Sequence, residues 1–231
     1  MNYKFKNKNI NLKLSKKVFK PNLTTECLIQ AISEKKFKRK LKILDLGCGT
    51  GIVGIFIKKY FNNKADVFMS DYSNEAIILA NKNIRLNKVS AKIIKSNVLN
   101  EWKNEKFDII VDDISAINSK IASKFWYNKS IPHDCGESGI ELSLEVIKKS
   151  KKFLNKNGKL IIPCISISDH KKLFSELKKN FKSVKLLVNK EWPAPPKLIS
   201  QFKKLLKEKN DYIYFKYGIA LCFTKIYECA I

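Results

Sequence analysis

The sequence has no long apolar run, and this absence limits where the protein can act. A membrane-spanning helix needs roughly 20 consecutive apolar residues, and no stretch of the 231 residues approaches that length. The N-terminal segment 1–17 is basic and lacks a continuous apolar block, so it does not have the pattern of a secretory signal. We therefore expect a cytoplasmic protein with no membrane partner.

Cysteine pairs at metal-binding spacing are also absent. The six cysteines are scattered along the chain, and none of them forms a C-x-x-C pair. This argues against a zinc ribbon and against a thioredoxin-type motif. His133, Asp134 and Cys135 are adjacent, but neighbouring residues rarely share one ion and no fourth ligand is evident. We expect no metal, and reduced cysteines that pack in the core.

Arginine is nearly absent from a strongly basic chain. The net charge is +25, yet Arg39 and Arg85 are the only arginines among 46 basic residues. A basic balance suggests an anionic partner such as RNA or the ribosome, whereas bidentate contacts to phosphate and guanine favour arginine. Lysine, asparagine and isoleucine are abundant throughout, as in proteins encoded by AT-rich genomes. An RNA partner and a solvated lysine-rich surface both stay open.

Glycine is scarce, with 8 residues, and three of them stand together after an apolar run. Leu41–Leu46 predicts a short buried strand, and a helical pattern begins at Ile52. Between them lie Gly47, Cys48, Gly49, Thr50 and Gly51. Glycines at a sharp turn let a ligand approach the backbone, and the N–H groups of the following helix point at that ligand. Asp45, near the end of the strand, is expected to face the same crevice.

The spacing of these glycines excludes two common nucleotide motifs. A dinucleotide fingerprint, G-x-G-x-x-G, needs its third glycine one residue later, and a P-loop needs Gly-Lys-Ser/Thr after the turn. The pattern of strand, D-x-G-x-G-x-G and helix resembles motif I of the class I S-adenosylmethionine (SAM)-dependent methyltransferases. In that family the glycines lie against the methionine part of SAM, and the acidic residue helps to hold its amino group. A bare structural turn between strand and helix is the alternative.

Two further strand ends supply candidate cofactor residues. Residues 65–70 predict a strand followed by Asp71, about 20 residues beyond the glycines, where a carboxylate can accept from ribose hydroxyls. Tyr72 can lie against the adenine ring. After the third predicted strand, Asn97 and the backbone N–H of Val98 can contact the adenine. The alternatives are that Asp71 caps the next helix and that Asn97 belongs to an ordinary polar loop.

The segment before the glycines, Val18–Ile32, predicts an extended turn at Pro21 and a helix capped by Thr24 or Thr25. It resembles the stretch V-x-x-P-R-P-x-T-E-x-L that precedes motif I in the release-factor glutamine methyltransferases and contacts their cofactor. The resemblance implies cofactor contacts for Thr25 and Glu26. An ordinary capped helix packed on the sheet is the alternative.

The largest departure from this family follows the fourth predicted strand, residues 107–113. Relatives end this strand with [N/D]-P-P-[Y/F], in which a planar amide and a proline carbonyl hold the acceptor nitrogen. Here the residues are Asp113, Ile114, Ser115 and Ala116. Because a carboxylate suits an acceptor that presents a hydrogen-bond donor, we interpret Asp113 as the catalytic residue and Ser115 as a substrate contact. A structural strand-end carboxylate is the alternative for Asp113.

Two aromatic regions are candidates for the acceptor site. The irregular segment 116–138 leaves the carboxyl end of a central strand, where ligands bind in open α/β sheets. Its candidate substrate contacts are Trp126, Tyr127 and His133, although a lone loop histidine is also an ordinary surface residue. About residues 190–210, we expect a polyproline-like insertion followed by a lysine-rich helix. Trp192 in this insertion offers a stacking surface or packs in the core.

The resemblance covers roughly residues 18–165 and predicts one doubly wound α/β domain with a mostly parallel, seven-stranded sheet. Residues 1–40 are expected to form an N-terminal strand and helix, and residues 41–231 the methyltransferase core, whose long helix should end at Gly158. The resemblance implies methyl transfer from SAM to nitrogen or oxygen, with a protein of the translation apparatus favoured as acceptor. An RNA or DNA base, a small molecule, and a non-enzymatic SAM- or RNA-binding subunit are the alternatives.

Overall fold

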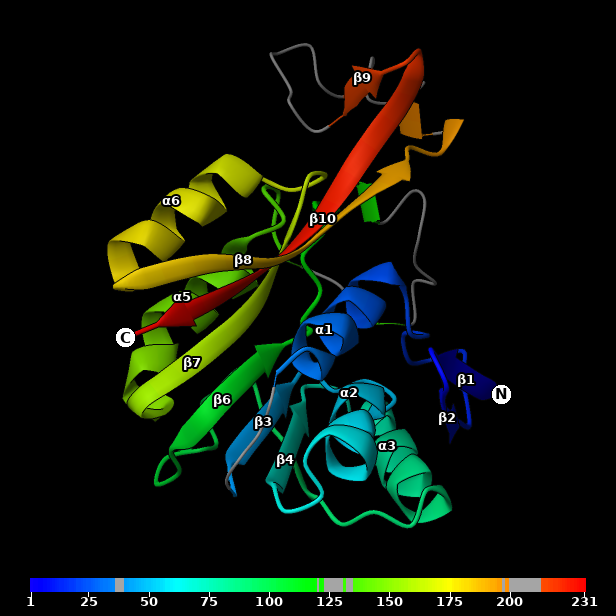
Figure 1. Ribbon diagram of the computed structural model, residues 1–231, viewed down its shortest axis with the longest axis vertical. Coiled ribbons are helices and arrows are strands. Elements are labelled where there is room, and N and C mark those ends of the chain that lie inside the picture. The colour runs from blue at the N-terminus through cyan, green and yellow to red at the C-terminus, as the bar shows by residue number, and fades with distance from the viewer. Residues whose placement is uncertain (36–39, 120, 123–130, 132–134, 197, 200–212) are drawn as a thin grey trace.

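The computed structural model describes residues 1–35, 40–119, 121–122, 131, 135–196, 198–199 and 213–231 (Figure 1). Its helices and strands, in chain order, are β1 (Asn2–Phe5), β2 (Lys8–Asn11), α1 (Leu23–Ser33), β3 (Lys42–Leu46), α2 (Ile52–Phe56), the π-helix η1 (Ile57–Phe61), β4 (Asp66–Asp71), α3 (Asn74–Leu86), β5 (Lys92–Lys95), β6 (Phe107–Asp112), α5 (Glu141–Phe153), β7 (Leu154–Ile165), α6 (His170–Asn180), β8 (Ser183–Pro193), β9 (Tyr214–Lys216) and β10 (Ile219–Ala230).

The central sheet has the strand order β5-β4-β3-β6-β7-β10-β8, and β9 pairs with β10 as an eighth strand. Strands β3 to β7 pair in parallel, whereas β10 runs antiparallel to both β7 and β8. The strands at the centre are almost continuously apolar, as expected for parallel strands that are buried on both faces. The prediction of a mostly parallel α/β fold is confirmed.

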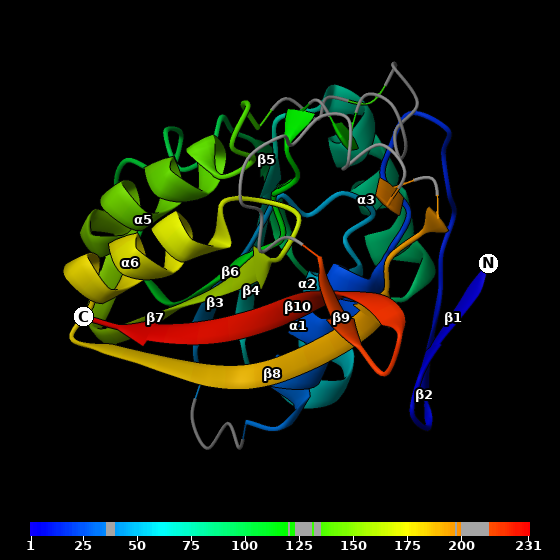
Figure 2. The same ribbon diagram turned by 90° about the horizontal axis from the view of Figure 1, so that it is seen from above.

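Helices cover both faces of this sheet (Figure 2). Helices α1, α2 and α3 lie on one face, and α5 and α6 lie on the other. Because successive side chains of a strand point to opposite faces, Ile43 belongs to the core under α1 and α2, while Leu44 belongs to the core under α5 and α6. Because β3 to β7 run in the same direction, their carboxyl ends all lie at one edge of the sheet.

The boundaries of two elements differ from the sequence-based predictions. Helix α5 ends at Phe153 instead of Gly158, because Leu154 already pairs with Phe107 and the residues after it form an irregularity in β7. The expected polyproline-like segment at Trp192 is instead the end of β8, where Trp192 lies opposite Cys222 of β10. Pairing between strands thus outweighs the local preference of the prolines. The predicted lysine-rich helix lies outside the described residues, apart from 198–199.

A segment that we call the N-terminal strap, residues 11–22, crosses α3 on its way to α1. Asn83 of α3 accepts a hydrogen bond from the backbone N–H of Lys13 at 2.7 Å and donates one to its carbonyl at 3.1 Å. One helical turn later, Asn87 accepts from the N–H of Asn11 at 3.2 Å and donates to its carbonyl at 2.8 Å. These two asparagines fix the strap against α3 as a neighbouring strand would.

Candidate active site

A cavity of about 330 Å³ lies at the carboxyl ends of β3, β4, β5 and β6. Its volume falls within the range of small-molecule sites, roughly 300–1,000 Å³. The strap, the first turn of α1, the glycine turn and the segments after the strands form its walls. The sequence-predicted residues that line it are Thr25, Gly47, Cys48, Gly49, Thr50, Asp71, Tyr72, Asn97, Val98, Asp113 and Ser115.

The glycine turn passes tightly between the ends of β4 and β6. The N–H groups of Gly47 and Cys48 both donate to the carbonyl of Ser70 at 2.9 Å. Gly47 has φ +76°, and a Cβ at this position would lie 2.9 Å from the backbone nitrogen of Ile114. Only glycine fits both the backbone angle and this close approach. The turn therefore holds its backbone next to the cavity with no side chain at Gly47.

Asp71 ties this turn to the end of β4. Its Oδ2 accepts from the N–H of Gly49 at 2.9 Å, and its Oδ1 accepts from the N–H of Ser73 at 2.9 Å. Burial raises the pKa of Asp71, and backbone hydrogen bonds from Ser73, Gly49 and Tyr72 oppose this rise. Each carboxylate oxygen can accept another hydrogen bond. Asp71 is thus a preorganised acceptor that faces the cavity and could hold two hydroxyls of a ligand.

The wall after β5 carries an unusual backbone conformation. Val98 has φ +52°, a region that β-branched residues rarely adopt, and the Ser96 hydroxyl donates to its carbonyl at 2.8 Å. Such conformations persist where the surroundings enforce them, often at ligand sites. On the adjoining rim, the Tyr72 side chain is 61% exposed and the Lys95 ammonium lies 5.9 Å from its ring centroid.

Asp113 connects the end of β6 to α1. Its Oδ2 accepts from the Thr25 hydroxyl at 3.0 Å, and its backbone N–H donates to the carbonyl of Leu46 at 2.9 Å. Burial raises the pKa of Asp113 well above its ordinary value; the negative charges of nearby carboxylates add to this rise, and the Thr25 hydrogen bond opposes it. When neutral, Asp113 presents one donor and one acceptor, much as the planar amide of an asparagine does.

Four carboxylates gather at this edge of the sheet: Asp45, Asp71, Asp112 and Asp113. Among the described residues, none of the four forms an ion pair, although the chain has a net charge of +25. Burial raises the pKa of all four, and those of Asp45 and Asp112 reach about 7. A site that keeps carboxylates free of lysine suits a ligand that brings its own positive charge.

The structure corrects the expected orientation of Asp45. This side chain is fully buried beneath the glycine turn, does not line the cavity, and accepts from the N–H of Gly54 at 2.9 Å. Sequence reasoning missed Gly54, which permits this arrangement. A Cβ at Gly54 would lie 2.3 Å from the Met69 side chain and 3.2 Å from Asp45 Oδ2. Four glycines rather than three therefore shape the turn and its helix.

Three other predicted contacts also lie outside the cavity. Gly51 packs against Ala80 of α3. Glu26 is exposed to solvent, because it follows Thr25 on the helix and Thr25 faces the cavity. Trp192 donates from Nε1 to the Thr224 hydroxyl at 3.1 Å and packs against a separate cluster. The remaining predicted substrate contacts, Trp126, Tyr127 and His133, lie outside the described residues.

The cap of α1 and the strap also differ from expectation. Asn22, not a threonine, caps α1 by accepting from the N–H of Thr25 at 3.1 Å. Residues 17–22 line the cavity, and only the V-x-x-P pattern at Val18 and Pro21 signalled this wall. Within the described ranges, no helix has the length and apolar character to cross a membrane. The same ranges hold no group of three His, Cys, Asp or Glu side chains arranged for a metal.

Comparison with known proteins then decides the family. Residues 15–113 match the model of the methyltransferase small domain. The release factor glutamine methyltransferase of Borreliella burgdorferi is 31% identical over 205 residues, which cover 83% of this chain and 68% of that protein. The chain belongs to the small-domain family of class I methyltransferases. The ribosomal RNA small subunit methyltransferase C of Haemophilus influenzae is 31% identical to this methyltransferase over 60% of the chain, but only 36% of the relative is covered.

Solved structures show the same fold. A 16S rRNA methyltransferase of T. thermophilus, in complex with AdoMet and guanosine, has a TM-score of 0.58 and 16% identity. The match covers 96% of this methyltransferase and 49% of that chain. SAM is the cofactor of this family, and the cavity of the methyltransferase fits it. The two carboxylates that line the cavity without a described lysine partner, Asp71 and Asp113, suit a ligand that carries positive charge, and Asp71 also suits its ribose hydroxyls.

Proposed function

We propose that this methyltransferase transfers the methyl group of SAM to a nitrogen atom of a protein in the translation apparatus. The observation that carries the proposal is Asp113, a carboxylate in the cavity wall whose Oδ2 is held by Thr25 at 3.0 Å. The Borreliella burgdorferi relative, which covers most of this chain, is named for methylating glutamine in a release factor. That relationship supports a protein acceptor.

The reaction needs positioning more than covalent chemistry. When bound, SAM supplies a methyl group on a sulfonium; the acceptor nitrogen forms the new N–C bond as the S–C bond breaks. The glycine turn and Asp71 hold the donor, and Asp113 hydrogen-bonds an N–H of the acceptor so that its lone pair points at the methyl carbon. Fixing two reactants in this way accounts for a large share of enzymatic rate enhancement.

Asp113 also receives the proton that the acceptor nitrogen loses. Its Oδ2 is engaged by Thr25, and no other described side chain donates to it, so Oδ1 is the oxygen that we assign to the acceptor. Because its pKa is raised, principally by burial, Asp113 is a stronger base than an exposed aspartate when it is ionised. The Thr25 hydroxyl stabilises that ionised form and fixes its orientation.

A labelling experiment tests this assignment. Tritiated methyl transfer from SAM into a cell extract, fractionated into protein, RNA and small molecules, should place label in the protein fraction. Asp113→Ala should reduce labelling about 100- to 1,000-fold, because it removes both a positioning contact and a base. Calorimetry should show SAM affinity within a few-fold of the wild-type value. Unreduced labelling by Asp113→Ala would contradict the role of Asp113.

A ribosomal RNA acceptor is the second candidate, favoured by the Haemophilus influenzae relative, which is named for rRNA methylation. Enzymes that act on a flipped base stack it against aromatic or apolar side chains, whereas Asp113 is followed by Ile114, Ser115 and Ala116. This segment offers no aromatic platform, and for that reason we rank the protein acceptor first. Label in the RNA fraction would reverse the order.

A further inference from the structure

The N-terminal strap carries a concentrated positive charge that methyl transfer does not explain. Residues 1–25 contain seven lysines and no aspartate or glutamate. Four of these lysines are exposed on the strap: Lys13, Lys16, Lys17 and Lys20. Among the described residues, this group forms one ion pair, from Lys17 to Glu75 at 3.7 Å between exposed side chains. Such an exposed pair contributes little stability, so these charges do not serve the fold.

The strap is held in a defined position. Asn83 and Asn87 bind the backbone of Lys13 and Asn11, and Asn83 is completely buried. Asn83 also donates to the carbonyl of Thr50, in the glycine turn, at 2.9 Å. The lysines therefore project from a backbone that is fastened to the same turn that forms the cavity. Lys17 and Lys20 themselves line that cavity.

We propose that the strap lysines form a docking surface for the phosphate backbone of RNA, next to the mouth of the cavity. Phosphate contacts position a protein on a nucleic acid without reading its sequence, and they need only point charges. Lysine supplies such point charges, and the bidentate fork of arginine, which suits carboxylates, phosphates and bases alike, is not needed for them. The strap presents four such charges within residues 13–20 and no acidic residue among them, which suits the closely spaced phosphates of an RNA backbone.

Docking on RNA is independent of the atom that accepts the methyl group. A ribonucleoprotein presents phosphates and protein side chains together, so an enzyme held by RNA can methylate a neighbouring protein. The RNA contact forms before methyl transfer. Its test needs neither SAM nor a known acceptor, so failure of the docking surface and failure of the proposed methyl transfer are separate results.

The test compares two variants with the same loss of charge. The strap variant replaces Lys13, Lys16, Lys17 and Lys20 with glutamine, and the control variant does the same to four lysines exposed near α5, α6 and the start of β8: Lys152, Lys156, Lys172 and Lys182. Affinity for a fluorescent single-stranded RNA is measured over a range of salt concentrations. A plot of log affinity against log salt has a negative slope. The strap variant should make this slope shallower by about 3, since each contact to a single strand contributes roughly 0.7. The control should make it shallower by less than about 1.

A second pair of measurements keeps the outcome decisive. Lys13→Gln with Lys16→Gln changes lysines that do not line the cavity and should make the slope shallower by about 1.5, with thermal unfolding confirming the fold. Equal slopes in the strap and control variants would overturn the proposal. Competition by polyglutamate as effective as competition by RNA would also overturn it, because the surface would then suit an acidic protein.

Discussion

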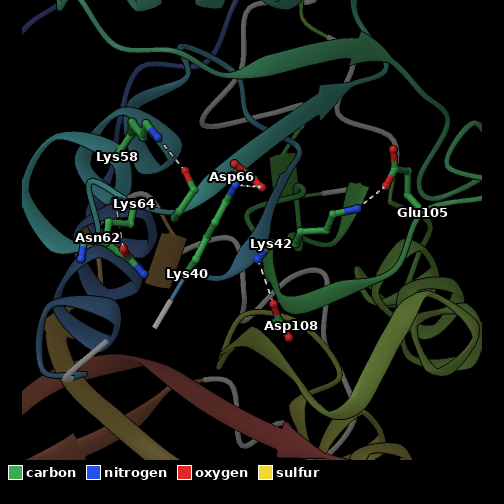
Figure 3. A network of polar contacts seen from close by, with 9 residues as sticks. Lys40, Lys42, Lys58, Asn62, Lys64, Asp66, Glu105 and Asp108 are labelled. Atoms are coloured by element: carbon green, nitrogen blue, oxygen red, sulfur yellow. Dashed lines mark hydrogen bonds and ion pairs between the residues drawn. The ribbon is translucent and has the colours of Figure 1, made fainter. Parts of the chain in front are cut away.

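The carboxylates at the two edges of the parallel sheet differ in whether they pair with lysine. At the amino edge, acids face lysines: Asp66 pairs with Lys40 at 2.9 Å and Glu105 with Lys42 at 3.0 Å (Figure 3). At the carboxyl edge, no described lysine pairs with the four gathered carboxylates. The amino-edge pairs are solvated and contribute at most about 1 kcal/mol each. Burying carboxylates at the carboxyl edge lowers the stability of the fold, which indicates that this edge is organised for a ligand and not for stability.

The carboxyl edge holds its acids with neutral donors. The backbone N–H groups of Gly49 and Ser73 donate to Asp71, and that of Gly54 donates to Asp45. The Thr25 hydroxyl donates to Asp113. Such donors orient a carboxylate without neutralising its charge, whereas a lysine would compete with a cationic ligand for the same oxygens. Single substitutions test this difference between the edges, because each one removes a carboxylate or its neutral donor.

Asp71→Ala should have the largest effect. It removes the acceptor for two backbone N–H groups and, in the binding mode that we propose, for the ribose hydroxyls; hydrogen bonds to a charged group contribute about 1.5–3 kcal/mol each. We expect SAM affinity, measured by calorimetry, to fall about 100-fold or more. Asp66→Ala is the matched control, because Asp66 begins the same strand β4 but pairs with Lys40 at the amino edge. Similar SAM affinity in the two variants would refute the contrast between the edges.

The residues whose position at the cavity follows from the sequence are those fixed by local geometry. Asp71, Gly47 and Gly49 closely follow buried strands, and the end of a parallel strand places its residues at the ligand edge whatever the rest of the fold does. The contact between Thr25 and Asp113 was not predictable in this way. It joins residues 88 positions apart, and the phase of α1 decides that Thr25, rather than Glu26, faces inward.

The orientation of Asp45 shows the same limit. Strand alternation indicates the face of the sheet, but only the absence of a side chain at Gly54 allows the carboxylate to turn under α2. The strap likewise depends on Asn83 and Asn87, whose pattern on a helix is that of ordinary polar residues. Long-range packing therefore decides the parts of the site that local spacing leaves open.

Asp45→Asn should change stability rather than affinity. The pKa of Asp45 is raised from 3.8 to about 7 by burial, so the folded state gains from its neutral form below about pH 4 and loses this contribution as the pH rises through 7. A shift of about three pKa units corresponds to about 4 kcal/mol of stability. In the asparagine variant, the NH2 group would stand where Asp45 Oδ1 has no hydrogen-bond partner, and this unsatisfied donor offsets about 2 kcal/mol of the gain. The variant should be about 2 kcal/mol more stable than wild type at pH 8.

Chemical denaturation at several pH values checks this expectation. Wild-type stability should decline between pH 4 and pH 8, and Asp45→Asn should decline less steeply. Asp112→Asn provides a companion, because burial raises the pKa of Asp112 to about 7 as well. Parallel curves for wild type and Asp45→Asn would show that Asp45 is ionised in the folded protein across this range, contrary to a raised pKa of about 7.

Thr25→Val should have the smallest effect and gives the finest test of how neutral donors tune this edge. Valine keeps the shape of threonine but removes the hydroxyl that stabilises ionised Asp113 at 3.0 Å. The pKa of Asp113 should therefore rise further, and the acid limb of the pH–rate profile should move to higher pH by about one unit, the equivalent of about 1.4 kcal/mol. Thr25→Ser keeps the hydroxyl and should restore the wild-type profile, which a purely structural role for Thr25 would not require. If the rate of Thr25→Val fell equally at every pH, Thr25 would orient the Asp113 carboxylate without setting its charge.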